Sequence, residues 1–278
     1  MPNTALVVSA HSADFVWRAG GAIALHATLG WEVTVVCLSY GERGESAKLW
    51  KQPGMTLDRV KAEREEEAKA AAKVLGVHDI QFWDLGDYPI NLTQDAFFRL
   101  VDVYRAIHPK FMLTHSEKDI YNHDHPSVSA WAQNARITAQ AHGHNPHQKV
   151  LGAPPVFLFE PHQPEQCAWK PDVLLDISSA WDKKRAAIEC MAGQEHLWEY
   201  YTRVALQRGA HAARNSDKSI KYREGYQSIF PHVVETLARA SPHRAAAAVS
   251  SNGPIAVSPM RSRARARRSY SPMALAGI

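Results

Sequence analysis

Two continuous runs of apolar, mostly β-branched residues lie near the start of the chain, at residues 4–10 and 32–39. Parallel strands that are buried on both faces have this pattern, because neither face has to present polar side chains to water. Residues 15–29 lie between the two runs and predict a helix. A strand, a helix and a second strand in this order indicate a parallel βαβ unit.

The alternation of strands and helices continues along most of the chain. Further short strands are predicted at 80–83, 111–114, 155–159 and 173–177, and further helices at 56–75, 95–107 and 126–141. Gly76 predicts the end of the helix at 56–75, since glycine readily adopts the left-handed conformation that follows a helix. Helices are expected from residue 179 to about 240. The predicted fold class is α/β, with a Rossmann-like, mostly parallel sheet flanked by helices and a helical C-terminal part.

The composition changes at about residue 241, where Ala, Ser, Arg and Pro become dominant. Residues 241–278 contain few large apolar side chains, so they cannot bury enough surface to offset the entropy lost on ordering. We therefore expect one α/β domain over residues 1–240 and a disordered basic tail over residues 241–278.

The net charge of the chain depends on that tail. The formal charge is +4, and the tail holds six arginines and no acidic residue. Removing these six charges leaves about −2 on the rest of the chain. The basic character therefore belongs to the tail and gives no support to nucleic-acid binding by the folded body, so no nucleic-acid partner is expected.

Other features of the composition concern the cellular location of the protein. No run of about 18 apolar residues is present, so no membrane span or membrane partner is expected. The first residues carry no basic segment ahead of the first strand, which argues against a secretion signal. The three cysteines, Cys37, Cys167 and Cys190, are scattered and predict neither a disulfide framework nor a thiolate metal site. A cytoplasmic location is expected.

Polar side chains follow three of the predicted strands. His11 and Asp14 come after the first strand, residues 41–46 after the second, and residues 121–126, which include His125, after the strand at 111–114. Ligands of open parallel sheets bind beyond the carboxyl ends of the strands. Imidazole and carboxylate groups suit zinc or a similar divalent ion, and catalytic zinc sites use three protein ligands and one open position. Each motif alone is weak, but together they predict a metal site.

The combination resembles the PIG-L (LmbE-like) superfamily of zinc-dependent N-deacetylases. Its Ala-His-Pro-Asp-Asp, Gly-Glu-x-Gly and His-Pro-Asp-His motifs correspond to residues 10–14, 41–44 and 122–125, and its Arg-x-x-Glu pattern ending in Leu-Gly corresponds to Arg64, Glu67, Leu75 and Gly76. The resemblance covers about residues 4–180. It implies that His11, Asp14 and His125 hold a divalent metal, with zinc expected and ferrous iron as the alternative.

Two positions depart from the family pattern. Ala13 stands where the family has its general base, and Asn122 stands where the family has the histidine that assists the tetrahedral intermediate. Alanine cannot accept a proton from water, and loss of a positioned general base typically costs about 10²–10⁴ in rate. The metal-ligand positions are filled while both hydrolytic helpers are absent, which argues against deacetylation.

More closely, the chain is similar to a divergent group within this superfamily, the hydratases of bacterial gallate degradation. Residues 39–63, 82–89, 153–167 and 190–209 carry this resemblance. It implies a metal-dependent hydro-lyase that adds water to a conjugated carbon–carbon double bond of a small tricarboxylic keto acid. The alternatives are a zinc-dependent N-deacetylase or amidase with a relocated base, and an inactive metal- or sugar-binding module. A homo-oligomer is also expected.

Hydration of a conjugated double bond requires a base for the water and an acid for the neighbouring carbon. Glu42 and Glu45, after the second strand, and His162, beyond the strand at 155–159, are the candidates. The alternatives to a catalytic role are that Glu42 organises its own loop and that His162 is a solvated loop histidine. Asp124 is expected to orient a ligand histidine, as carboxylates beside metal ligands commonly do.

A tricarboxylate substrate also requires cations. Arg18, Arg43 and Arg64 lie in or near the loops that are expected to form the mouth of the site. Arginine binds carboxylates through two parallel hydrogen bonds, so these three residues are predicted to bind substrate. Solvation at the protein surface is the alternative for each of them.

Overall fold

The computed structural model describes residues 2–213 and 219–231. Within them, seven strands form one sheet in the order β3-β2-β1-β4-β5-β7-β6. The strands are β1 (Thr4–Ser9), β2 (Glu32–Cys37), β3 (Asp79–Phe82), β4 (Phe111–Thr114), β5 (Val156–Phe159), β6 (Val173–Asp176) and β7 (Arg223–Ser228). Strands β1 to β5 pair in parallel, whereas β7 is antiparallel to both β5 and β6. The predicted α/β class with a mostly parallel sheet is confirmed.

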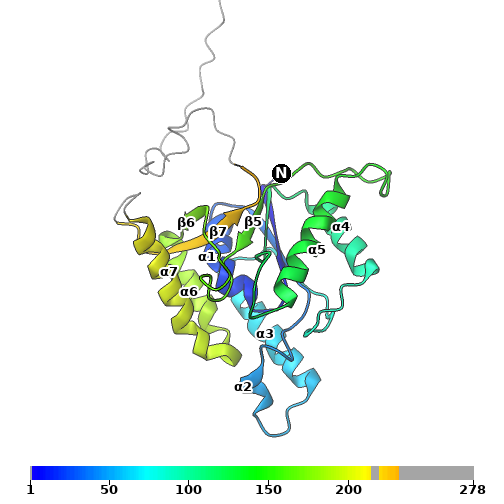
Figure 1. Ribbon diagram of the computed structural model, residues 1–278. Coiled ribbons are helices and arrows are strands. Elements are labelled where there is room, and N and C mark those ends of the chain that lie inside the picture. The colour runs from blue at the N-terminus through cyan, green and yellow to red at the C-terminus, as the bar shows by residue number, and fades with distance from the viewer. Residues whose placement is uncertain (1, 214–218, 232–278) are drawn as a thin grey trace, which may run out of the picture. The chain divides into compact units, whose positions relative to one another are not determined.

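Helices cover both faces of the sheet. They are α1 (Asp14–Thr28), α2 (Ala47–Trp50), α3 (Leu57–Leu75), α4 (Gln94–Ile107), α5 (Asp124–Ala139), α6 (Trp181–Glu189) and α7 (Trp198–Ala212), with 3₁₀ turns η1 (Ser178–Ala180) and η2 (Ala192–Leu197). Helices α4 and α5 pack on one face, and α1, α3, α6 and α7 contribute to the core on the other (Figure 1). This double cover explains why the central strands are apolar along their whole length.

Strand β1 shows how alternate side chains serve the two cores. Ala5 and Val7 belong to the core that α1 and α3 cover, whereas Leu6 and Val8 belong to the core beneath α4 and α5. All four side chains are buried. Full burial of a Val or Leu side chain contributes roughly 1.5–3 kcal/mol, so β1 is a stable base for the loop that follows it.

Helix α3 has the bounds that its sequence signals predicted. The side chain of Thr56 accepts a hydrogen bond from the backbone N–H of Arg59, which satisfies one of the free donors at the helix start. Gly76 ends the helix with φ = 78°, in the left-handed region that favours glycine. Both ends therefore follow from local chemistry.

The prediction of helices throughout residues 179–240 is wrong at β7. The segment Arg223–Ser228 is largely polar, yet it forms a strand because it fits between β5 and β6, with Tyr226 opposite both Phe159 and Val173. Glu224 is buried in this strand and pairs with Lys184 of α6 at 2.6 Å. These partners are distant in sequence, so local periodicity could not reveal them. The predicted tail, residues 241–278, lies outside the described residues and stays a prediction, as does the domain boundary near residue 240.

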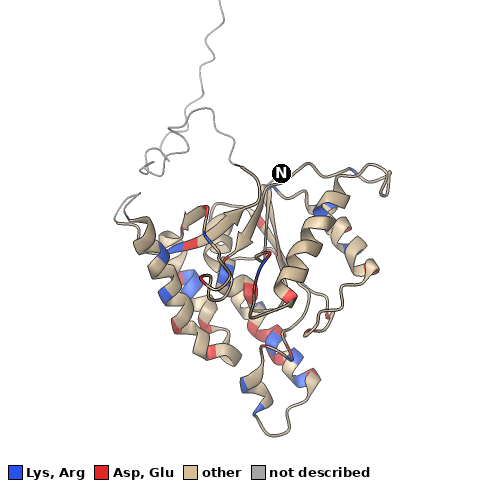
Figure 2. Ribbon diagram, viewed as in Figure 1, with Lys and Arg blue, Asp and Glu red and all other residues tan. Residues whose placement is uncertain are grey.

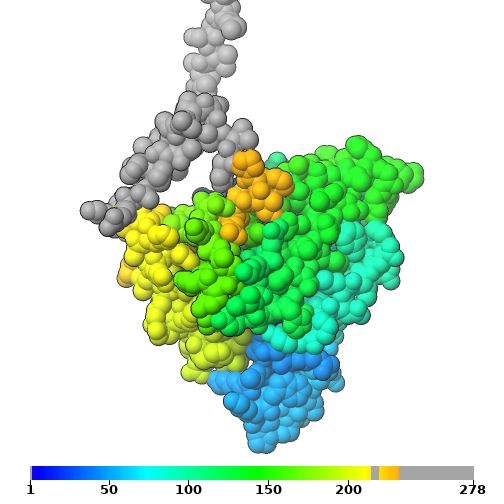
Figure 3. All heavy atoms as spheres, in the orientation of Figure 1, coloured from blue at the N-terminus to red at the C-terminus, as the bar shows by residue number. Residues whose placement is uncertain are grey.

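Acidic and basic residues are interspersed along the helices, for example on α3 (Figure 2). None of the helices in the described residues is long and apolar enough to cross a membrane. In the space-filling view, α2 and the start of α3 project at one end of the described part (Figure 3). The loop that joins β2 to α2, residues 38–46, contributes residues to the candidate site.

Candidate metal centre and adjoining cavity

The metal-ligand candidates meet where the sheet reverses its strand order. Strand β1 lies between β2 and β4, so the loops after these three strands leave the same edge of the sheet. His11 and Asp14 follow β1, Glu45 follows β2, and His125 lies in the first turn of α5, after β4. A crevice at such a reversal is the usual ligand site of an open α/β sheet.

The four side chains form one cluster. One ligand atom from each of His11, Asp14, Glu45 and His125 lies within 4.8 Å of the others. Nδ1 of His11 is 3.1 Å from Asp14 Oδ2 and 3.3 Å from Glu45 Oε1, and Nε2 of His125 is 3.4 Å from Asp14 Oδ1. The structure thus brings the three predicted ligands together and adds Glu45, which had been predicted as a proton-transfer group.

The residues of the cluster fit a divalent metal ion. Nε2 of His125 and Oε2 of Glu45 are buried without a hydrogen-bond partner among the described residues, which is costly unless another group binds them. Burial by itself lowers the pKa of His11, but Glu45, Asp124 and Asp14 raise it well above its usual value. The carboxylates therefore make the site strongly attractive to a cation. Imidazole nitrogens with carboxylate oxygens are the donor set of catalytic zinc sites.

Two further carboxylates contact the ligand histidines. Oδ2 of Asp124 is 3.3 Å from Nε2 of His11, and Asp124 also accepts the backbone N–H groups of Tyr88 and Ile90. Burial raises the pKa of Asp124, but the contact with His11 and these two N–H groups lower it to about 2. The geometry supports the predicted role of Asp124 in orienting a ligand histidine.

Asp119 holds the second histidine in the same way, a role that was not predicted from the sequence. Its Oδ2 is 2.9 Å from Nδ1 of His125, and such contacts fix the orientation of a ligand ring. His115 stacks on His125 with ring centroids 4.2 Å apart, and its Nε2 accepts the backbone N–H of Ala10 at 2.9 Å. The position of Asp119 in the loop before His125 was the available signal.

A cavity of about 600 Å³ opens beside the cluster. Its wall contains Glu45, His125, His162 and Arg18, and these residues come from four separate segments of the chain. Asn122 also lines the cavity and donates from Nδ2 to Oε1 of Glu45 at 3.3 Å. Two of the three predicted proton-transfer residues therefore share one cavity with the ligand cluster.

The structure places Glu42, Arg43 and Arg64 away from this cavity. Glu42 is buried, and its Oε2 accepts the backbone N–H of Tyr40 at 3.2 Å, so it organises its own loop. The side chain of Arg43 is 59% exposed. The backbone of this loop directs Glu45 inward, and the neighbouring side chains of Glu42 and Arg43 consequently face elsewhere.

Arg64 is fully buried and has protein partners for its guanidinium. It donates to Glu67 Oε2 at 2.6 Å and to Gln194 Oε1 at 2.7 Å. Gln194 lines the cavity, so Arg64 supports the wall from behind. The expectation that Arg43 and Arg64 bind substrate directly is corrected accordingly, because neither guanidinium reaches the cavity.

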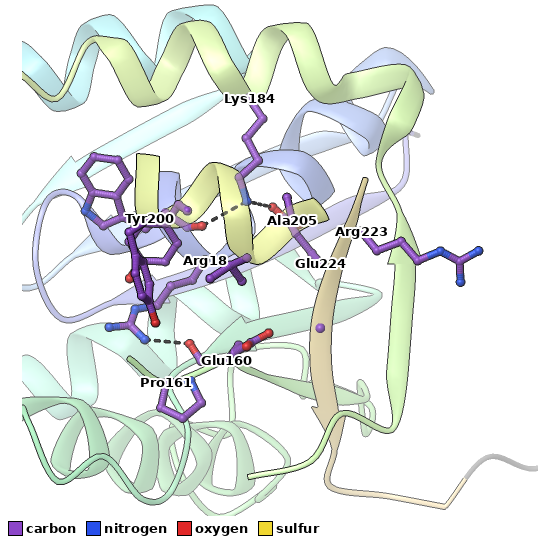
Figure 4. A pocket seen from close by; sticks show the side chains of 12 residues that line it. Arg18, Glu160, Pro161, Lys184, Tyr200, Ala205, Arg223 and Glu224 are labelled. Carbon is purple, nitrogen blue, oxygen red and sulfur yellow. Dashed lines mark hydrogen bonds and ion pairs between the residues drawn. The ribbon is translucent and has the colours of Figure 1, made fainter. Parts of the chain in front are cut away.

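Arg18 is the one predicted substrate-binding arginine at the cavity. Its Nη1 donates to the backbone oxygen of Glu160 at 2.7 Å, and its Nη2 lies 4.0 Å from Asp119 Oδ2. A second, smaller cavity lies behind it, where Figure 4 shows Arg18 directed toward Glu160 and Lys184 directed toward Glu224. Glu224 in turn accepts backbone N–H groups of α1, so this buried ion pair supports the helix that carries Arg18.

Comparisons with known proteins agree on one family. The profile described as PIG-L, GlcNAc-PI de-N-acetylase, matches residues 6–136. A curated relative, 4-oxalmesaconate hydratase of Pseudomonas putida, is 64% identical over 240 residues, which cover 85% of this chain and 93% of the relative. Diacetylchitobiose deacetylase of Thermococcus kodakarensis is 25% identical over 82% of this chain and 85% of its own length.

Solved structures show the same relationship. The crystal structure of GalB, the 4-carboxy-2-hydroxymuconate hydratase of Pseudomonas putida, matches with a TM-score of 0.82 and 63% identity, over 84% of this chain and 99% of that one. An N,N'-diacetylchitobiose deacetylase from Pyrococcus horikoshii matches with a TM-score of 0.68 and 20% identity, over 82% and 84% of the two chains. The second likeness concerns the fold alone.

Proposed function

The chain belongs to the PIG-L family, and from this premise we propose that it is a hydratase that adds water to 4-oxalomesaconate, giving 4-carboxy-4-hydroxy-2-oxoadipate. The two hydratase relatives are named for 4-oxalmesaconate and for 4-carboxy-2-hydroxymuconate. The observation that carries the proposal lies in the site: Ala13 offers no carboxylate, while Glu45 of another loop stands 3.3 Å from ligand His11. We propose that the site keeps the metal-ligand positions of a deacetylase and takes its base from a different loop.

His11, Asp14 and His125 would hold the metal, for which zinc is proposed because it suits imidazole and carboxylate ligands together. When bound, the metal supplies a Lewis acid that polarises an oxygen of the substrate. Asp124 and Asp119 keep the two imidazoles in the orientation and tautomer that binding requires. The proposal includes a cytoplasmic location and self-association of the chain, with no role for nucleic acid or membrane.

Glu45 is proposed as the base that takes a proton from the attacking water. Burial raises the pKa of its carboxyl, but His11 lowers it to below its usual value, so the carboxylate is ionised near neutral pH. The water oxygen bonds to the fully substituted carbon of the double bond, which becomes C4 of the product, and one proton leaves to Glu45. The neighbouring carbon gains one proton, so a single water is added.

His162 is proposed to take over the proton that Glu45 removed from the water and to deliver it to the neighbouring carbon, which leaves Glu45 ionised again. It lines the same cavity from the loop after β5. Burial and the charge of Arg18 lower its pKa from the usual 6.5, so the ring is neutral at rest and can accept a proton before passing it on. General acid–base groups of this kind typically contribute about 10²–10⁴ to the rate.

Arg18 is proposed to bind a substrate carboxylate. Among the described residues that line the cavity, it is the only Lys or Arg. Its guanidinium is held by the backbone oxygen of Glu160 on one side and lies near Asp14 and Asp119 on another. A guanidinium fixed in this way needs little further ordering to meet a carboxylate.

The deacetylase alternative is less well supported. Glu45 could serve as a relocated base, but Asn122 has no imidazole to assist an amide tetrahedral intermediate, and it donates to Glu45 instead. The test is to incubate metal-loaded protein with 4-oxalomesaconate and identify the product by mass and NMR. A gain of one water, with the hydroxyl on the fully substituted carbon C4, is expected, and unchanged substrate would contradict the proposal.

A further inference from the structure

Tyr200, in the first turn of α7, contacts the loop that carries His162 at two points. Its ring lies against the His162 imidazole with centroids 4.6 Å apart and a tilt of 35°. Its hydroxyl oxygen accepts the backbone N–H of Gln163 at 3.2 Å. One tyrosine thus holds both the imidazole and the peptide that follows it.

The backbone at Gln163 requires such support. Gln163 has φ = 54°, a left-handed conformation that residues other than glycine rarely adopt. Unfavoured backbone conformations persist only where the surroundings impose them, and they are concentrated at functional sites. Because Gln163 directly follows His162, this turn sets the direction in which the imidazole leaves the loop.

Tyr200 is itself fixed by the wall of the cavity. Its ring packs edge-on against Tyr201 with centroids 5.0 Å apart, and Tyr201 stacks on Trp17 of α1 at 5.2 Å. Figure 4 draws Tyr200 beside Arg18, and both line the smaller cavity behind that wall. The support therefore runs from α1 through two tyrosines to His162.

We propose that Tyr200 is a positioning residue: it orients the His162 imidazole toward the substrate through ring packing and holds the left-handed turn at Gln163 through its hydroxyl. This inference rests on the proposed proton-transfer role of His162. Tyr200 does not line the main cavity, so it acts through His162 and not on the substrate.

The pKa of His162 provides a second readout, in addition to the reaction rate. Its pKa is lowered, first by burial and then by Arg18, while Asp119 and Glu45 act in the opposite direction and His125 adds to the lowering. If the turn at Gln163 relaxes, the ring becomes more hydrated, and its pKa moves upward toward the usual value.

The experiment compares Y200F with the wild type and with Y222F in metal-loaded full-length protein. Y200F keeps the ring but removes the hydroxyl, and Y222F makes the same change at the ring that stacks on Trp181, away from the cavity. We expect Y200F to lower kcat about tenfold with little change in KM, as a small misplacement of a catalytic group does. The NMR titration of His162, assigned from the signal missing in H162Q, should shift upward in Y200F alone.

A second substitution tests whether Tyr200 acts by holding the left-handed turn at Gln163. Glycine adopts a left-handed φ without penalty, so Q163G in the Y200F background should restore most of the lost kcat, with Q163G alone as the baseline. Wild-type kinetics and an unshifted His162 titration in folded Y200F would overturn the proposal. A lower kcat with an unshifted titration would also overturn it. If H162Q hydrates at the wild-type rate, the proton-transfer role fails, while the titration of His162 still decides the positioning role.

Discussion

Oε1 of Glu45 lies 3.3 Å from Nδ1 of His11, although the two residues follow different strands. A carboxylate therefore stands beside the proposed metal ligands even though Ala13, next to Asp14, provides none. The parallel pairing of β1 with β2 produces this arrangement, because it places the two following loops at the same edge of the sheet. The proposed change of reaction depends on this second source of a carboxylate.

Replacing Glu45 by Gln should lower kcat for hydration by about 10²-fold or more, since the amide cannot accept the water proton. Steady-state kinetics with metal content measured in parallel would check this. Glu66→Gln is the matched control, because Glu66 is an exposed residue of α3. A larger loss in Glu42→Gln than in Glu45→Gln would return the base to Glu42 and contradict the assignment.

Alanine at His11, Asp14 or His125 should each empty the metal site or weaken it severely, because three ligands leave no redundancy. Asp119→Asn should have a milder effect, a loss of metal affinity of about 10–100-fold, since it acts through the orientation of His125. Elemental analysis after dialysis against a weak chelator measures both. Full metal occupancy in all three alanine variants would show that the cluster is not the metal site.

Arg18→Met should raise KM for the tricarboxylate by about tenfold or more, because a charge-assisted hydrogen bond to a carboxylate contributes about 1.5–3 kcal/mol. Arg43→Met provides the comparison, because the side chain of Arg43 is exposed and outside the cavity. Equal changes in KM for the two variants would exclude the special role given to Arg18.

The pH dependence follows from the sign of the His162 shift. A lowered pKa means that the neutral ring persists to lower pH, so kcat/KM should fall only below pH 6.5 and remain level above it. Glu45 also has a lowered pKa and stays ionised over that range. A pH–rate profile, with the metal content verified at each pH, measures this fall of kcat/KM on the acidic side. The H162Q variant should not show the fall. A limb with a midpoint well above 6.5 would be incompatible with a neutral His162 at rest.

Much of the fold was predictable because the signals were local. The two-sided burial of β1 and β2 produces uninterrupted apolar runs, and Thr56 and Gly76 mark both ends of α3 through their own hydrogen bonding and backbone freedom. Strand β7 was not predictable, because its polar residues are buried only through distant partners such as Lys184. Tertiary contacts decided this element.

The site was predictable as far as strand ends and motifs specify it. His11, Asp14 and His125 meet because parallel strands end at one edge, and Asp124 lies within the same motif. Side-chain direction inside a loop was not predictable. Glu42 and Glu45 are three residues apart, yet one faces the loop backbone and the other the ligand cluster.

The proposed reaction of this PIG-L site is hydration of a double bond and not cleavage of an amide. The most direct test measures kcat/KM of one metal-loaded preparation on 4-oxalomesaconate and, in parallel, acetate release from an N-acetyl sugar. Hydration that exceeds deacetylation by at least about 10⁴-fold is expected, because the site lacks both the aspartate at position 13 and the histidine at position 122, each worth about 10² or more. Comparable rates on the two substrates, or acetate release without hydration, would contradict it.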